Sequence, residues 1–77
     1  MKNDRKTFKE MLNLCYEEDF PELHYELLSL EAKTKKEKDY KTSMGEILNA
    51  ISAFTEDFPI ETFVQIENLY QDFLENE

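Results

Sequence analysis

Glycine and proline, which are typical of tight turns, are scarce in this chain. Its 77 residues include one glycine and two prolines, and no segment alternates apolar and polar side chains for long. β-Hairpins depend on such turn residues and on that alternation, so helices are favoured over a sheet. The sequence therefore predicts an all-α fold, a small bundle of three to four helices arranged as two helical hairpins.

Two Phe-Pro pairs divide the chain into segments. A residue that precedes proline is disfavoured in the α region, whereas proline suits the first turn of a helix. Phe20-Pro21 and Phe58-Pro59 are each expected to precede a helix. The expected helices run over residues 3, 4 or 7 to 17–19, 21 to at least 32, 43 through 54, and 59 to about 74.

Two short sequence motifs have the pattern of a capping box. In Thr7-x-x-Glu10 and Ser43-x-x-Glu46 a hydroxyl residue precedes a glutamate by three positions, which is typical of a helix start. Between residues 31 and 41 only an alanine and a tyrosine are apolar. Two alternatives fit that segment, a continuation of the second helix or a loop.

Length and composition indicate one domain over residues 1–77. A core of this size supplies only a few kcal/mol, and Cys15, the only cysteine, cannot form an internal disulfide. An internal duplication of residues 1–41 and 42–77 would explain why Glu-x-Leu-Asn recurs at Glu10 and Glu46, although convergence would explain it too. No apolar run approaches the roughly 18 residues of a membrane span, so we expect a cytoplasmic, reducing location.

The sequence contains no set of residues that indicates catalysis. It has one cysteine and one histidine, too few for a nucleophile with its base or for a structural metal site. Cys15 lies on the apolar stripe of the first helix, which predicts a buried thiol. His24 and Glu31 share a helix face within about 20°, either paired near the core or as an edge histidine beside a solvated glutamate. We expect a protein without enzymatic activity, cofactor or metal.

Charge is distributed unevenly along the chain. Residues 42–77 carry eight carboxylates and no Lys or Arg, whereas residues 1–41 hold all nine cations against ten carboxylates. The electrostatic field of such an excess of carboxylates repels nucleic acid and attracts basic proteins. The lysine-rich stretch 33–41 is interpreted as a solvated linker because a nucleic-acid patch is usually more basic and lies on a basic domain.

Two helix faces are candidates for contacts with other chains. The apolar residues of the fourth helix cover an arc of about 220°, more than one seam requires, so this helix is either central or meets another chain. The remaining strip lacks cations and is predicted to bind the partner: Glu61, Gln65, Asn68, Asp72 and Glu75. The third helix has a face of small, almost uncharged residues that would allow a close helix–helix contact: Gly45, Asn49, Ser52 and Ala53.

These observations support two hypotheses of different classes. The first is a small acidic, non-catalytic protein-binding module, an inhibitor, antitoxin, immunity-type or regulatory factor that docks on a basic protein surface. The alternative is a self-assembling structural or scaffold protein in which the surplus apolar arc forms a homodimer. Direct binding of nucleic acid or membrane is expected in neither case.

Overall fold

Four α-helices make up the computed structural model, which describes residues 4–54 and 56–76. They are α1 (Asp4–Tyr16), α2 (Pro21–Glu37), α3 (Tyr40–Ser52) and α4 (Ile60–Glu75). No strand occurs in the described residues, and the predicted all-α bundle is confirmed. Within the same ranges, no helix has both the length and the apolar character that crossing a bilayer requires.

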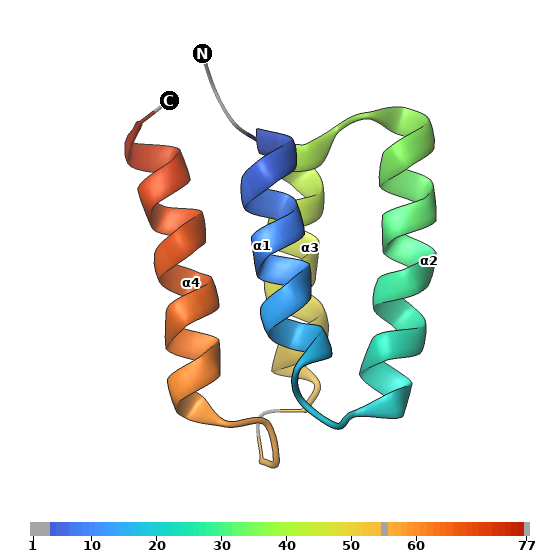
Figure 1. The fold of residues 1–77 in the computed structure, drawn as a ribbon, viewed down its shortest axis with the longest axis vertical. Coiled ribbons are helices and arrows are strands. Elements are labelled where there is room, and N and C mark those ends of the chain that lie inside the picture. Colours follow the sequence, from blue (N-terminus) through green and yellow to red (C-terminus); the bar gives the residue numbers. More distant parts are fainter. Residues whose placement is uncertain (1–3, 55, 77) are drawn as a thin grey trace.

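Successive helices run in opposite directions around a central pair. α1 and α3 lie one in front of the other in Figure 1, with α4 on one side and α2 on the other. α1 packs closely on α3 and α4, and α2 packs mainly on α3; within the described residues, α2 and α4 make no contact. The molecule is flattened, with extents of 35 × 25 × 17 Å. α1 therefore contacts α2 and α4 as well as α3, its partner in the central pair.

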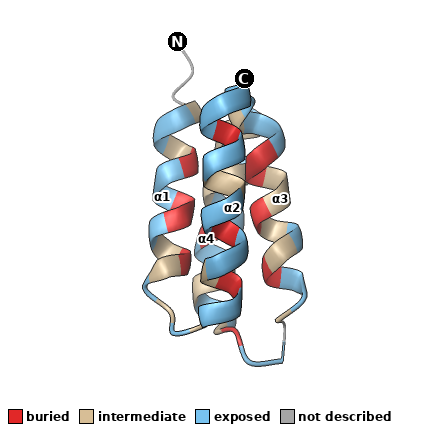
Figure 2. Cartoon of the chain, turned by 90° about the vertical axis from the view of Figure 1, so that its right-hand side faces the viewer, coloured by how far each residue is buried: buried red, intermediate tan, exposed pale blue. Residues whose placement is uncertain are grey.

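The core forms from one apolar face of each helix and from the loop before α4. On α1 and α3 the buried residues recur at helical spacing, as the sequence stripes predict. In Figure 2 the buried positions turn toward the interior, while the outward face of α2 is almost wholly exposed. The buried apolar residues are Phe8, Met11, Leu12, Cys15, Leu23, Leu27, Met44, Ile47, Ile51, Phe58 and Ile66.

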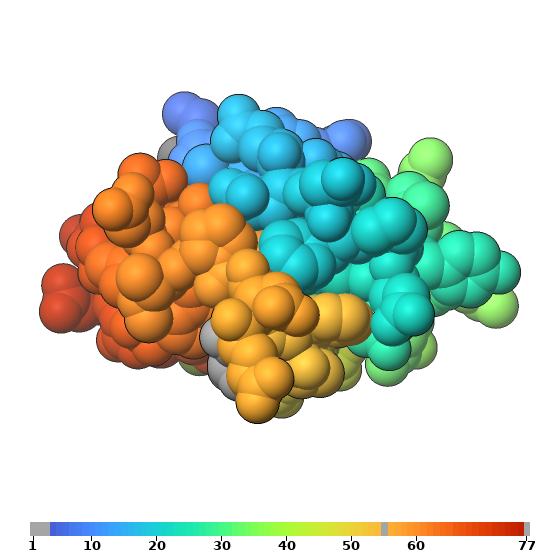
Figure 3. All heavy atoms as spheres, turned by 90° about the horizontal axis from the view of Figure 1, so that it is seen from below, coloured from blue at the N-terminus to red at the C-terminus, as the bar shows by residue number. Residues whose placement is uncertain are grey.

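The two Phe-Pro pairs meet at one end of the bundle. The ring of Phe20 lies 5.4 Å from that of Phe58 and 6.2 Å from that of Phe54, measured between centroids. Such aromatic pairs each contribute about 0.5–1.5 kcal/mol beyond their buried area. Thr62 Oγ1 also donates a hydrogen bond to Glu18 Oε2 at 2.8 Å. The two loops at this end consequently lie side by side when the molecule is seen from below (Figure 3).

The structure decides between helix and loop for residues 31–41. α2 continues to Glu37 and ends at Lys38, whose φ of 59° is left-handed and whose N–H donates to the carbonyl oxygen of Thr34 at 2.6 Å. Asp39 then caps α3, because its Oδ1 accepts the N–H of Thr42 at 3.3 Å. The tight connection is a left-handed helix end followed directly by a helix start.

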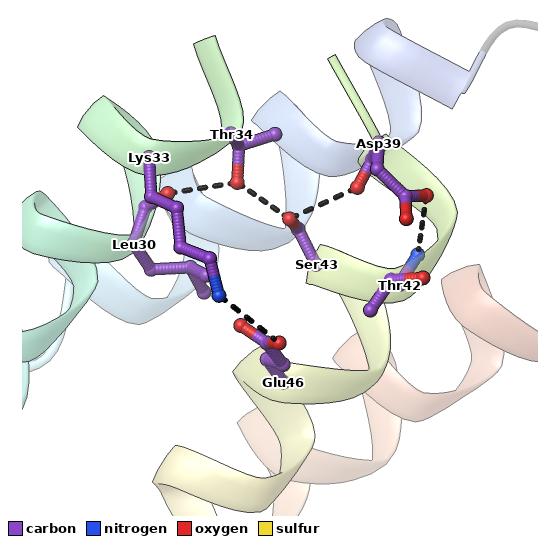
Figure 4. A network of polar contacts seen from close by, with 7 residues as sticks. All are labelled: Leu30, Lys33, Thr34, Asp39, Thr42, Ser43 and Glu46. Atoms are coloured by element: carbon purple, nitrogen blue, oxygen red, sulfur yellow. Dashed lines mark hydrogen bonds and ion pairs between the residues drawn. The ribbon is translucent and has the colours of Figure 1, made fainter. Parts of the chain in front are cut away.

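Neither capping box starts a helix, although α1 is described from Asp4, one of the alternative starts predicted for it. Thr7 lies inside α1 and Ser43 lies inside α3, which begins one turn earlier than the motif Ser43-x-x-Glu46 suggested. The Ser43 hydroxyl instead donates to the carbonyl oxygen of Asp39 at 3.0 Å and contacts the hydroxyl of Thr34. Thr34 donates in turn to the carbonyl oxygen of Leu30 at 2.7 Å (Figure 4). The two hydroxyl groups thus share two protons among three contacts, of which the one between Thr34 and Ser43 joins α2 to α3.

The prediction of a solvated linker over residues 33–41 is confirmed only in part; most of them are exposed, but only residues 38 and 39 form a linker between helices. Thr34 is almost completely buried, and its hydroxyl finds a partner on α3 rather than in water. Lys33 Nζ lies 3.8 Å from Glu46 Oε1 on the exposed side of the same contact (Figure 4). An exposed pair of this kind contributes little to stability. Buried Thr34 thus packs the end of α2 against α3, while the lysines of the segment remain exposed.

Candidate docking surface

The predicted partner-binding strip forms one continuous face of α4. Successive residues turn by about 100° around a helix, which places the five strip residues within about 80° of one another. All five are exposed, so no described part of the chain covers them. Their role in binding stays a prediction. The strip consists of Glu61, Gln65, Asn68, Asp72 and Glu75.

A groove of about 500 Å³ lies between this strip and α1. α1 and α4 are antiparallel neighbours (Figure 1), so residues 10–17 form one wall and residues 65–72 form the other. The strip residues Gln65, Asn68 and Asp72 belong to the groove, whereas Glu61 and Glu75 are not part of its lining. The lining residues are Glu10, Asn13, Leu14, Glu17, Gln65, Asn68, Leu69 and Asp72.

Sequence reasoning missed the α1 wall of this groove. Glu10, Asn13 and Glu17 follow one another at i, i+3 and i+7, a spacing that puts them on one side of a helix. That spacing is visible in the sequence beside the apolar stripe of α1. It acquires meaning only when α4 lies alongside, because the acidic side chains of the two helices then border the same space.

The lining of the groove is acidic and contains no cation. Glu10 and Glu17 on α1 face the same space as Asp72 on α4. In the described part of the chain, no ion pair or hydrogen bond reaches these three carboxylates. Like charges around a concave surface raise the local concentration of cationic groups. The arrangement therefore attracts a basic ligand and repels an acidic one.

Two of the three cations of α1 lie toward α2, whereas helical spacing places Lys6 on the groove side of α1. Arg5 and Lys9 line a smaller pocket of about 110 Å³ together with Lys35 and Glu31 from α2. α1 thus separates an acidic groove shared with α4 from a predominantly basic pocket shared with α2. The two surfaces that flank α1 therefore differ in charge.

Two leucines give the acidic groove an apolar part. Leu14 of α1 and Leu69 of α4 are half-buried and line the same space as the carboxylates. An apolar group that covers them would gain about 25 cal/mol for each Å² removed from water. The lining offers carboxylates, amides and aliphatic groups, and in the described residues no cluster of His, Cys, Asp and Glu is suited to a metal ion.

The small-residue face of α3 is only partly open. Gly45 is half-buried, and a β-carbon at this position would lie 3.5 Å from the hydroxyl oxygen of Tyr70. Gly45 therefore faces α4 of the same chain. Asn49, Ser52 and Ala53 are exposed, and whether they contact a second copy stays a prediction.

Most of the wide apolar arc of α4 packs inside the chain. Ile66 is buried and several of its neighbours are half-buried against the core. Ile60 and Val64, by contrast, are 72% and 43% exposed. On the opposite side of the bundle, Tyr25 and Leu28 of α2 are 76% and 58% exposed. The apolar excess is thus largely internal, with two small exposed groups that are not adjacent.

His24 and Glu31 both contact Tyr16 rather than each other. The Tyr16 hydroxyl donates to Glu31 Oε1 at 3.2 Å, and the Tyr16 and His24 rings meet edge to face at 5.4 Å. His24 is half-buried, and its Nε2 donates a hydrogen bond to the carbonyl oxygen of Glu18 at 2.6 Å. Burial, together with the charge and hydrogen bond of Glu31, raises the pKa of Tyr16 to about 12. This contact joins α1 to α2.

Cys15 is a core residue, as its place on the apolar stripe predicts. Its side chain is fully buried, and burial raises the pKa of the thiol to about 12. A thiolate is the reactive form of cysteine, so at neutral pH this group stays protonated and unreactive. Its contribution is packing within the contact between α1 and the rest of the core.

Comparison with protein-family models, with curated protein sequences and with solved structures finds no match to this chain. Its function is therefore inferred from its own residues.

Proposed function

We propose that this protein is a small non-catalytic binding module, an inhibitor, antitoxin, immunity-type or regulatory factor, whose acidic α4 side docks on a basic protein surface. The observation that carries the proposal is the convergence of Glu10 and Glu17 with the acidic strip of α4 around one groove. These carboxylates come from both halves of the chain. Without ion-pair partners in the described residues, they remain available to cations of another protein.

The cost of this surface to the free protein supports the same proposal. Three carboxylates around one groove repel one another, and a solvated helix face usually mixes both signs of charge. A surface kept at the expense of stability is common where function requires it. The groove also provides the leucines that a purely solubilising acidic face does not need.

The test uses the purified protein as bait at low and high salt. A basic partner that is released by salt is identified, and its association rate is then measured with the variant Glu61→Gln, Asp72→Asn, Glu75→Gln. We expect slower association and a weaker salt dependence, because exposed charges act mainly through long-range attraction. The matched control replaces Glu22, Glu26 and Glu37 of α2 by Gln; all three are exposed. Equal rates for both triple variants would refute the proposed docking side.

The alternative function, self-assembly, draws on the exposed apolar groups of α2 and α4. Tyr25 with Leu28, and Ile60 with Val64, would be covered in a homodimer. Sedimentation from about 1 to 100 µM distinguishes the two functions, since a standard interface of this kind gives micromolar or tighter association. A monomer throughout that range removes self-assembly, whereas a salt-insensitive dimer favours it over docking on a basic partner.

A further inference from the structure

We propose that the groove between α1 and α4 binds a basic amphipathic helix of another protein, with Lys or Arg at positions i and i+7 and apolar residues at i+3 and i+4. The inference rests on the proposed function and specifies its ligand. It follows from where the groove places its carboxylates and its leucines.

The spacing of the charges selects a helix over an extended peptide. Glu10 and Glu17 are seven residues apart on α1, a rise of about 10.5 Å at 1.5 Å per residue. Cations at i and i+7 of a second helix are the same distance apart and lie within about 20° on one face. In a strand, side chains on one face recur every two residues, at about 6.7 or 13.4 Å. Neither spacing matches the groove.

The apolar part of the groove fits between those charges. Leu14 lies in the α1 sequence between Glu10 and Glu17, and Leu69 faces it from α4. On a helix whose cations stand at i and i+7, the residues i+3 and i+4 lie midway along the same face. Their apolar side chains would cover both leucines while Asp72, on the second wall, meets a cation. Laying an apolar helix face into a groove is a common mode of peptide recognition.

A second copy of this chain cannot supply that pattern. Among its nine Lys and Arg residues, only Lys2 and Lys9 are seven positions apart. The positions i+3 and i+4 of that pair are Arg5 and Lys6, so cations would stand where the leucines require apolar groups. Charge complementarity therefore indicates a different, basic protein as the occupant.

The probe is a helical, alanine-based peptide of about 15 residues with Arg at i and i+7 and Leu at i+3 and i+4. The control peptide has the same composition, but its leucines stand at i+2 and i+5, on the opposite face. At low ionic strength we expect the first peptide to bind about tenfold more tightly, since it alone covers both groove leucines. Methyl resonances of Leu14 and Leu69 should shift on binding, while those of Leu28 on α2 should not.

Charge variants complete the test on the folded protein. Glu10→Gln, Glu17→Gln, Asp72→Asn should weaken binding of the first peptide by fivefold or more, whereas the α2 control Glu22→Gln, Glu26→Gln, Glu37→Gln should stay within about twofold. If both peptides bind equally and the groove methyls do not shift, the ligand geometry is wrong although docking on the acidic side stands. If neither binds and a basic protein is still captured in a salt-dependent way, the groove is refuted while the proposed function survives.

Discussion

Replacing Gly45 by alanine should stabilise this protein. Gly45 lies within α3, where glycine costs about 0.5–1 kcal/mol relative to alanine. The backbone at this position does not need glycine, because the φ angle of Gly45 is not positive. The new β-carbon would lie 3.5 Å from the hydroxyl oxygen of Tyr70, an ordinary van der Waals distance. The gain in helix propensity is therefore not offset by a clash.

The expected gain is about 0.5–1 kcal/mol, which raises the melting temperature of a domain of this size by about 2–8 °C. Thermal unfolding followed by circular dichroism at 222 nm measures it, and Ala50→Gly on the same helix serves as the reverse control with a loss of similar or greater size. The measurement is made at two protein concentrations. If Gly45→Ala lowers the melting temperature only at the higher concentration, Gly45 takes part in a contact between two copies of the chain. Its packing against Tyr70 would then not explain why a glycine stands at this position. An unchanged or lower value at both concentrations would refute the reasoning.

Three further outcomes follow from the core and the helix ends. Ile47 is fully buried, so Ile47→Ala should lower the free energy of unfolding by about 2–5 kcal/mol in urea titrations. Ile47→Asp should prevent folding, and near-native stability of this variant would contradict the packing of α3 on the core. Burial raises the pKa of Cys15 to about 12 from an ordinary 9.0, so the stability due to this thiol is complete below pH 9 and is lost as the pH rises toward 12, by up to about 1.4 kcal/mol per pH unit. Cys15→Ala should therefore be less stable than the wild type at pH 8, but its free energy of unfolding should fall less between pH 8 and 10.5. Equal falls in the two proteins would contradict the effect of burial on the thiol. Lys38 has a φ of 59°, so Lys38→Gly should raise stability by about 0.4–1 kcal/mol, whereas a lower urea midpoint would contradict the left-handed helix end.

The sequence predicted the parts of this fold that depend on local periodicity. Phe8, Met11 and Leu12 of α1 and Ile47 of α3 lie on stripes whose burial the structure confirms. The Phe-Pro pairs marked the starts of α2 and α4 because proline restricts the backbone of its own and the preceding residue.

The start of α3 could not be predicted in the same way. Ser43 has the local pattern of a helix cap, but its hydroxyl is used in a contact with Thr34 of another helix. That contact depends on tertiary packing, which a four-residue motif cannot predict. Asp39, the residue that does cap α3, looked like one charge among many in a lysine-rich segment.

The acidic groove was half visible in the sequence. The strip of α4 could be found from its lack of cations, since charge and helical spacing are local properties. Glu10 and Glu17 are more than fifty residues away from Asp72 in the chain, and only the antiparallel packing of α1 on α4 brings them together. A pattern within one helix cannot reveal which helix will lie beside it.

The most direct test of the docking account is the ionic-strength dependence of association with the captured basic partner. Stopped-flow rates are measured for the wild type, for Glu10→Gln, Glu17→Gln, Asp72→Asn, and for the matched triple variant at Glu22, Glu26 and Glu37. Exposed charges are screened over a Debye length of about 10 Å at 0.1 M salt, so charges near the interface dominate the slope. The account predicts a flattened salt dependence for the groove variant and a nearly wild-type slope for the α2 variant. The same slope in both variants would show that only net charge matters and would contradict a docking site between α1 and α4.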